Sequence, residues 1–216
     1  MWTLFTSIDV SVVNMPSPVE IPERGAYHHG DLKRALTGAA LQLVQEKGPK
    51  GFTLREVARR AGVSAAAPYR HFADKAQLLA AVATQGFVQL HEELDATVAA
   101  HSDLSEQALA MGKAYVRWAV SHPDYYQVMF GTELDKTESP EVVAAGVRAF
   151  DDLLATIKRC QEAGLMAAGD PHETAGPIWS LLHGISMLTI GSDLTHVGIR
   201  EDTEALTERS LRQLMF

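Results

Sequence analysis

The sequence predicts an all-α protein in which a short N-terminal helix-turn-helix module is joined to a larger helical body. Apolar residues recur at helical spacing along most of the chain, with no sustained alternation of apolar and polar residues. Capping residues and prolines mark the starts of successive helical segments. The N-terminal part of the chain is basic and the remainder is acidic. Residues 21–86 contain ten Lys or Arg against five Asp or Glu, whereas the rest of the chain contains nine Lys or Arg against twenty-two Asp or Glu.

Length and composition set the broad class of protein. With 216 residues, 46% of them hydrophobic, the chain can form one large or two modest domains. The single cysteine, Cys160, rules out an internal disulfide and fits a reducing compartment. No apolar run reaches the roughly 18 residues that a membrane span needs. We therefore expect a cytoplasmic protein with no membrane partner.

The first residues stand apart from the helical pattern. The stretch MWTLFTSIDVSVVNM is apolar but has no Lys or Arg, so it lacks the charged start of a signal peptide. Our hypothesis is that translation begins at Met15 rather than Met1; otherwise residues 1–23 form a mobile tail. Three residues precede the first helix, either as an arm along DNA or as a solvated loop: Arg24, His28 and His29. Two adjacent histidines supply too few ligands for a metal, and we expect no metal site.

Two helices and a tight turn are predicted next. The first helix has an inward stripe of Leu32, Leu36, Ala39, Ala40 and Leu43. The second begins at a capping box formed by Thr53 and Glu56 and ends at Gly62, a residue that tolerates a left-handed backbone.

The third segment is the predicted recognition helix, running from Ala65 to about Phe72 with Ser64 as its cap. Its three leading alanines are slim enough for a major groove about 12 Å wide. Pro68 predicts a tight or irregular first turn. Because this module is also basic, the residues themselves predict double-stranded DNA as a partner.

The run TLREVARRAGVSAAAPYRHFADKAQLL resembles the DNA-binding signature of tetracycline-repressor-like (TetR) transcriptional regulators, and the resemblance covers Gly30 to Phe87. It implies that Tyr69 and His71 contact phosphate oxygens, with Lys75 adding a contact from the next helix. Core packing is the alternative role for Tyr69 and His71. Phe72 is expected in the core.

Base reading is assigned to the alanine methyl groups, which can touch thymine, and to Arg55 or Arg70, which can bond guanine. Arg59 and Arg60 are expected on a solvated face. The complete set of candidate DNA-contacting residues is Thr53, Arg55, Ser64, Ala65, Ala66, Ala67, Tyr69, Arg70, His71 and Lys75.

The remainder of the chain predicts six further helices. Asp74 with Gln77 and Asp103 with Glu106 each form a capping pair, and prolines open three of the later helices. The predicted helices span 74 to about 100, 103 to about 122, 123–130, 140 to about 164, 171 to about 191, and 202 to the C-terminus, with a loop at 131–138. The predicted domains are a DNA-binding domain at 24–73 and a regulatory and dimerisation domain at 74–216.

Aromatic and methionine side chains in the body are candidates to line a ligand pocket, with ordinary core packing as the alternative for each. His183 either orients a ligand or satisfies a buried carbonyl. The candidates are Tyr115, Trp118, Tyr126, Met129, Phe130, Phe150, Trp179 and His183.

The segment IWSLLHGISML, with Trp179, His183 and Gly184, resembles the regulatory domain of a Trp-His-Gly (WHG) subgroup of the same family. The family resemblance implies a small-molecule effector bound between the helices and a homodimer formed by the last two helices. The residues expected at that interface are Trp179, Leu182, Ile185, Ser186, Thr189, Leu206, Leu211 and Leu214.

The expected function is that of a sequence-specific regulator, most often a repressor released from a near-palindromic operator by its effector, with no cofactor. A transcriptional activator or an architectural DNA-binding protein is the nearer alternative. A ligand carrier or an enzyme is a more distant one, because the chain has no Gly-rich phosphate loop, HExxH or GxSxG motif.

Overall fold

The computed structural model describes residues 29–135 and 138–215, and for residues 29–31 the backbone alone. Within these ranges every regular element is a helix, which confirms the all-α prediction. The tail, the Met15 start and the arm residues Arg24 and His28 lie outside the described residues, as does the side chain of His29.

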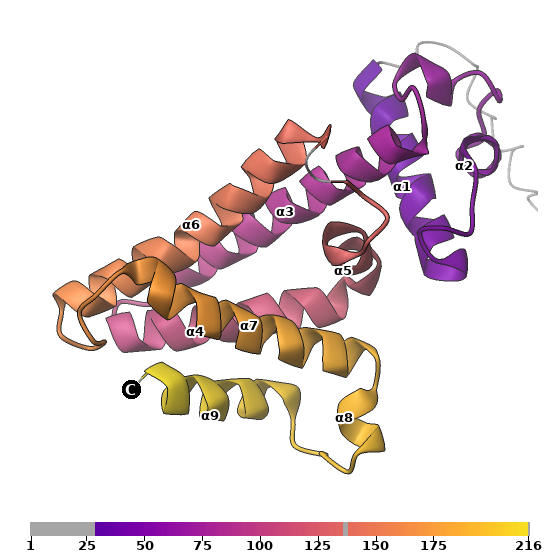
Figure 1. The fold of residues 1–216 in the computed structure, drawn as a ribbon. Coiled ribbons are helices and arrows are strands. Elements are labelled where there is room, and N and C mark those ends of the chain that lie inside the picture. The colour runs from indigo at the N-terminus through magenta and orange to yellow at the C-terminus, as the bar shows by residue number, and fades with distance from the viewer. Residues whose placement is uncertain (1–28, 136–137, 216) are drawn as a thin grey trace, which may run out of the picture.

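The helices follow one another through short connections (Figure 1). Their bounds are α1 His29–Lys47, α2 Leu54–Arg60, η1 Pro68–Arg70 (a 3₁₀ helix), α3 Lys75–Ala99, α4 Leu104–Ser121, α5 Pro123–Phe130, α6 Pro140–Glu162, α7 Pro171–Ile190, α8 Asp193–His196 and α9 Thr203–Met215. The helices from α2 onward, apart from η1 and α8, were predicted to within a few residues at their ends, whereas for α1 only the inward stripe was predicted.

The N-terminal head consists of α1, α2, η1 and the start of α3. Leu36, Leu43 and Val57 are almost fully buried where these elements meet. The predicted capping box is confirmed, since the Glu56 amide donates to Thr53 Oγ1 at 3.3 Å and the Thr53 amide donates to Glu56 Oε2 at 2.9 Å. Gly62 has φ +69°, the left-handed conformation expected of the residue that ends this helix.

The predicted helix from Ala65 to Phe72 is wrong in extent. Residues 65–67 form a turn, and only Pro68–Arg70 is helical, as a single 3₁₀ turn. Pro68 has no amide hydrogen, so the bond that an α-helix would require at that position cannot form. The chain instead makes tighter bonds, from the Ala67 amide to the Ser64 carbonyl at 2.9 Å and from the His71 amide to the Pro68 carbonyl at 2.9 Å.

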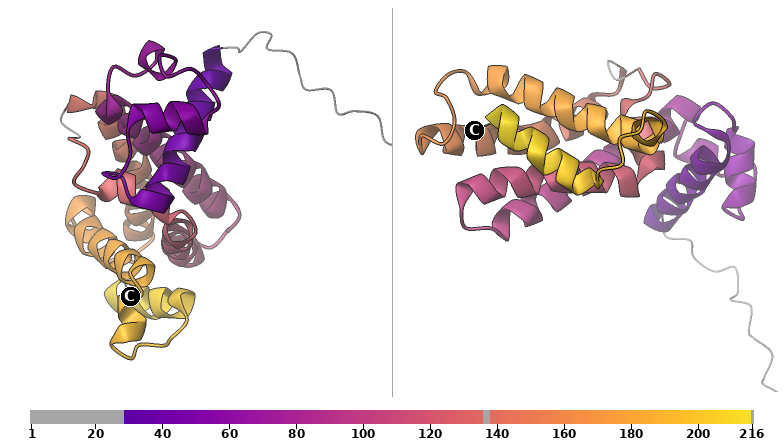
Figure 2. Two further views of the ribbon diagram at one scale, coloured as in Figure 1. Left: turned by 90° about the vertical axis from the view of Figure 1, so that its right-hand side faces the viewer. Right: turned by 90° about the horizontal axis from the view of Figure 1, so that it is seen from below.

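Helix α3 connects the head to the body. It starts at Asp74, whose Oδ1 accepts from the Gln77 amide at 2.9 Å, as the capping pair predicted. Its first turns pack on α1, and its remainder lies beside α6 and also contacts α4 and α5. Figures 1 and 2 show the head at one end of an elongated body, with α3 running from one into the other. A movement of α3 would therefore displace residues in both the head and the body.

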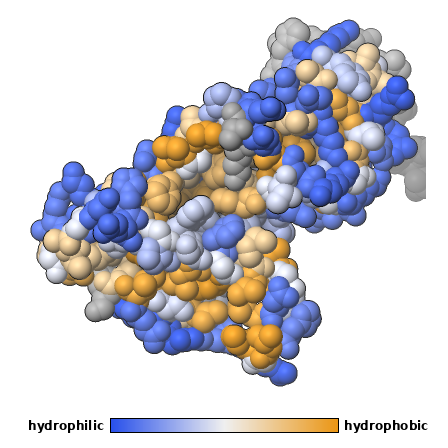
Figure 3. Space-filling model, viewed as in Figure 1, coloured by the Kyte–Doolittle hydropathy of each residue, from blue (hydrophilic) through white to orange (hydrophobic). Residues whose placement is uncertain are grey.

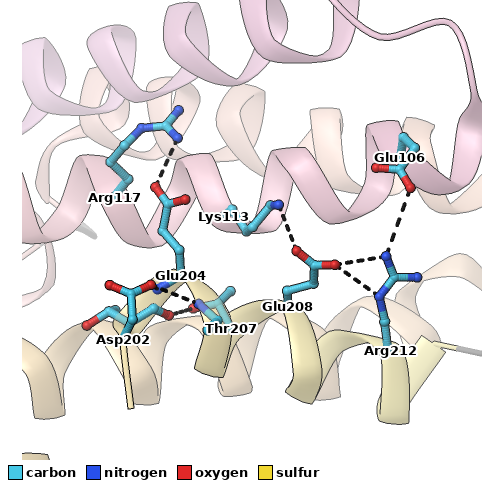
Figure 4. Close-up of polar contacts among 10 residues, drawn as sticks. Glu106, Lys113, Arg117, Asp202, Glu204, Thr207, Glu208 and Arg212 are labelled. Atoms are coloured by element: carbon cyan, nitrogen blue, oxygen red, sulfur yellow. Dashed lines mark hydrogen bonds and ion pairs between the residues drawn. The ribbon is translucent and has the colours of Figure 1, made fainter. Parts of the chain in front are cut away.

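The C-terminal helix α9 packs along α4 and α7. Ion pairs join it to α4, with Lys113 Nζ 2.9 Å from Glu208 Oε2 and Arg117 3.4 Å from Glu204 (Figure 4). These groups are partly exposed, so each pair contributes at most about 1 kcal/mol. Leu211, which is 1% exposed, provides the apolar attachment of α9 to the core.

One helix was missed by the sequence reading. The single turn α8 follows Ser192, which has φ +61°. A four-residue helix is too short to display apolar periodicity, so the sequence contains no signal for it.

Candidate functional site

Two regions contain the predicted functional residues: the surface of the head around η1, and a cavity inside the body. In the head, η1 determines which side chains face solvent. With three residues per turn, Pro68 packs inward while Tyr69 and Arg70 point outward. Tyr69 is 53% exposed, an unusual value for a large aromatic residue. Phe72 is 3% exposed, which confirms its predicted core position.

The alanines before Pro68 do not all reach the surface. Ala65 and Ala66 are exposed together with Ser64, whereas Ala67 is only 8% exposed and belongs to the core. The assignment of Ala67 to base reading is therefore wrong, because the 64–67 turn directs its methyl group inward. Two small exposed side chains remain ahead of η1.

Lys75 has partners within the head. Its Nζ donates to the Lys50 carbonyl oxygen at 3.0 Å and lies 4.3 Å from the centre of the Phe52 ring. Burial lowers the pKa of the Lys75 ammonium, an effect opposed by the charges of Glu133 and Glu56. Lys75 therefore fastens the 50–52 turn to the start of α3, and any phosphate contact uses its remaining N–H donors.

Some charged residues of α2 form ion pairs within the head, and others are exposed to solvent. The ammonium of Lys47, together with Thr53, holds the pKa of the Glu56 carboxyl down to about 2. Arg60 forms a two-pronged pair with Glu46 at 2.7 and 2.8 Å, which agrees with its predicted place outside the DNA-contacting set. Arg55 is exposed on α2.

The cavity lies among five helices of the body and has a volume of about 70 Å³. Its wall is formed by Phe87, Leu90, Leu94, Met111, Tyr115, Phe130, Gly146, Ala149, Phe150, Leu153, Trp179 and Leu182. In Figure 3 the surface between α6 and α7 is hollowed and bordered by hydrophobic residues. Trp179, which is 39% exposed, and the half-buried Phe150 meet edge-on with their ring centres 5.9 Å apart.

Four of the eight predicted ligand residues line this cavity: Tyr115, Phe130, Phe150 and Trp179. Trp118 stacks on His122 instead, with ring centres 4.8 Å apart, and is 5% exposed. Met129 packs against Gly86, where an added Cβ would lie 2.5 Å from its sulfur. Neither residue lines the cavity, because both side chains turn away from it into the core, the alternative role stated for each.

Tyr126 and His183 form a polar chain beside the cavity. The hydroxyls of Tyr115 and Tyr126 are 2.9 Å apart, and the Tyr126 hydroxyl is 2.7 Å from His183 Nδ1. Tyrosine hydroxyls are neutral near pH 7, and burial raises the pKa of both still further. Neither Tyr126 nor His183 is part of the cavity wall; they lie behind Tyr115 and orient its hydroxyl.

Three wall residues of α3 were missed. Phe87, Leu90 and Leu94 are spaced three and four residues apart, the pattern of a single helix face. That periodicity was available in the sequence, but it identifies only an inward face and not which inward residues border a space.

Within the described residues, no three His, Cys, Asp or Glu side chains are grouped as a metal would require. None of the helices described has both the length and the apolar character needed to span a membrane.

Comparisons with known proteins agree with this arrangement. The family model for bacterial regulatory proteins of the tetR family matches residues 36–82, and the model for the tetracyclin repressor-like C-terminal domain matches residues 108–214. A solved structure of a protein of unknown function from Rhodococcus sp. RHA1 is 31% identical, with a TM-score of 0.77 over 87% of this chain and 95% of that one.

One curated relative is named as a regulator, and one further solved structure contains operator DNA. The HTH-type transcriptional regulator Rv1816 of Mycobacterium tuberculosis is 28% identical over 119 residues, which is 51% of this chain and 50% of that protein. The chain thus spans about half the length of this curated relative. AibR, solved with isovaleryl coenzyme A and operator DNA, is 18% identical, with a TM-score of 0.65 over 86% of this chain and 98% of that one.

The head matches one tetR-family model, most of the body matches the other, and the helical arrangement matches solved structures along most of its length. The chain belongs to the TetR family of bacterial transcriptional regulators.

Proposed function

We propose that this protein is a dimeric, sequence-specific DNA-binding regulator that represses transcription until a small molecule enters its cavity. The exposed pair Tyr69 and Arg70 on η1 is the observation that carries the proposal. A phenol and a guanidinium projecting together from a basic head are suited to a phosphate and to a guanine edge, respectively. Such a protein acts where the chromosome lies, which in bacteria is the cytoplasm.

The proposed dimer forms through α7 and α9, by a face that shares only part of the expected residues. Leu182, Ile185, Ser186 and Leu211 are buried within the single chain and do not reach a partner. The exposed apolar residues of these helices are Trp179 and Leu214, which belong to the expected set, together with Met187 and Leu188. A Cβ added at Gly176 or Gly184 on α7 would meet no neighbouring atom, so a second helix can approach closely there.

Effector control is proposed to act through α3. Phe87, Leu90 and Leu94 border the cavity, while Leu78 and Val82, nearer the start of the same helix, lie in the buried core that reaches the head. A molecule that enlarges the cavity would displace α3 and, with it, the distance between the heads of a dimer. A coupling of about 1 to 3 kcal/mol would weaken operator binding roughly 5- to 150-fold.

We also assign the chain to the WHG subgroup. Trp179 borders the cavity and His183 bonds the tyrosine chain behind it, so this motif is part of the effector site. For AibR, the recorded ligands are isovaleryl coenzyme A and operator DNA. That complex supports a comparable pairing of a small-molecule ligand and an operator for this chain.

Selection of bound duplexes from a random pool at near-physiological salt tests the proposal. The expected result is enrichment of a near-palindrome whose half-sites are roughly 34 to 36 Å apart, or slightly more. Absence of enrichment would overturn sequence-specific regulation and favour an architectural role. The position of the operator relative to a promoter then distinguishes repressor from activator.

A further inference from the structure

The chemistry of the cavity wall points to one class of effector. All twelve wall residues are uncharged, and only the Tyr115 hydroxyl and the Trp179 indole N–H are side-chain groups that form strong hydrogen bonds. A carboxylate or ammonium placed there would lose its hydration with no opposite charge to replace it. We propose that the effector is an uncharged, largely apolar molecule with a single hydrogen-bonding group, which binds at the Tyr115 and Trp179 corner of the cavity.

The wall also indicates the shape of this molecule. Five of its residues are aromatic: Phe87, Tyr115, Phe130, Phe150 and Trp179. Several meet at steep angles, such as Phe87 and Phe130 with ring centres 5.5 Å apart at 78°. Aromatic rings prefer edge-to-face contacts, so a flat ring inserted among them would find favourable partners. At about 70 Å³ the space holds only a few water molecules, so the effector is small or displaces Trp179 on entry.

Residues outside the cavity wall orient the Tyr115 hydroxyl at this corner. The Tyr115 hydroxyl is held by Tyr126, which is held in turn by His183. A chain of this kind fixes the direction in which the Tyr115 oxygen can donate or accept. A tyrosine hydroxyl is neutral near pH 7, and burial raises the pKa of Tyr115 further, so the corner provides uncharged hydrogen-bonding groups for an alcohol, ketone or amide.

The test uses the full chain without DNA and four probes of matched size: 2-phenylethanol, ethylbenzene, phenylacetate and 2-phenylethylammonium. Binding is followed by ligand-observed NMR titration at pH 7. The neutral alcohol is expected to bind at least about 100-fold more tightly than either ion, because the charged groups must be desolvated. Equal binding of either ion, or no binding by any of the four probes, would overturn the proposal.

Two variants test the location. Gly146→Leu places a side chain in the cavity, since its Cβ would lie 3.5 Å from the Phe87 ring in ordinary contact, and it is expected to weaken 2-phenylethanol binding at least about tenfold. Gly38→Leu is the matched control, because an added Cβ there meets open space on α1, and its binding should be unchanged. If the first variant binds normally, the molecule lies elsewhere.

The corner is tested with Tyr115→Phe, which keeps the ring and removes the hydroxyl. Affinity for 2-phenylethanol should fall roughly 2- to 13-fold, the value of one hydrogen bond, while affinity for ethylbenzene stays constant. Equal losses for both probes would overturn the assignment of the corner, and this test remains decisive if Gly146→Leu does not fold.

This inference rests on the proposed function in taking the cavity as the effector site, yet its test needs no operator. Probe binding together with a failed duplex selection would leave the ligand class standing and remove the regulator role. Duplex enrichment without the expected probe preference would support the regulator role and overturn the ligand class.

Discussion

Replacing Tyr126 by Phe tests whether the polar chain beside the cavity holds the body together. Tyr126 is fully buried, and its hydroxyl is 2.9 Å from the Tyr115 hydroxyl and 2.7 Å from His183 Nδ1. Phenylalanine preserves the ring contacts, so the change removes the hydrogen bonds that the Tyr126 hydroxyl makes with Tyr115 and with His183. With about 0.5 to 1.5 kcal/mol for each bond, we expect the unfolding free energy to fall by about 2 kcal/mol.

The assay is urea unfolding followed by circular dichroism at one fixed protein concentration, because the stability of a dimer depends on concentration. In a thermal scan the same loss corresponds to a fall of about 4 to 8 °C in Tm for a chain of this size. Tyr69→Phe is the matched control, since the Tyr69 side chain is 53% exposed and its change should fall within about 0.5 kcal/mol.

Tyr115→Phe completes the test of coupling. It removes the bond between the two hydroxyls but leaves the buried Tyr126 hydroxyl bonded to His183, so its cost should be the smaller. The double variant should cost less than the sum of the two single variants, because they share a bond. A Tyr126→Phe protein as stable as the control, or strict additivity, would refute the role given to this chain.

Three further outcomes are expected. Arg70→Ala should relax the base preference at one position in each half-site, whereas Tyr69→Phe should weaken binding to all duplexes alike. Binding assays on specific and on random DNA distinguish the two effects. If Arg70→Ala loses the same affinity for both kinds of DNA, Arg70 contacts a phosphate and not a base. Glu56→Gln should lower the unfolding free energy at pH 7. The pKa of Glu56 is held at about 2 against an ordinary 4.5, so the difference in stability between the parent and the variant should shrink as the pH falls from 4.5 towards 2. Urea unfolding at pH 7 and at pH 3 measures this change. Leu188→Glu, at an exposed position of α7, should shift the sedimentation of the protein to that of a monomer, whereas Val143→Glu on α6 should not; a dimeric Leu188→Glu protein would place the interface elsewhere.

Helix starts were the best predicted part of the fold, because a cap is a contact between residues two to four positions apart. Thr53 with Glu56, Asp74 with Gln77 and Asp103 with Glu106 all form the predicted backbone bonds. The recognition segment also depends on neighbouring residues, but its helix was predicted to be longer than it is. Pro68 predicted an irregular first turn, but its missing amide restricts the helix to three residues and leaves Ala67 in the core.

The cavity in the body shows what helical periodicity cannot predict. Trp118 and Trp179 both occupy helical stretches rich in apolar residues, but one stacks on His122 within the core and the other borders the cavity. Periodicity identifies the inward face of a helix, but not the helix that it meets or the space left between them. The same limit explains the omission of Phe87, Leu90 and Leu94.

The sequence by itself determined the all-α class, the order of the long helices, their caps and the helix-turn-helix resemblance, because each depends on residues close together in the chain. Tertiary structure decided which aromatic residues border the cavity, that Tyr115, Tyr126 and His183 form one hydrogen-bonded chain, and that Leu182, Ile185 and Leu211 are buried within the chain. These features depend on the packing of helices far apart in sequence, where small differences in helix rotation decide whether a side chain faces a neighbour, a cavity or solvent.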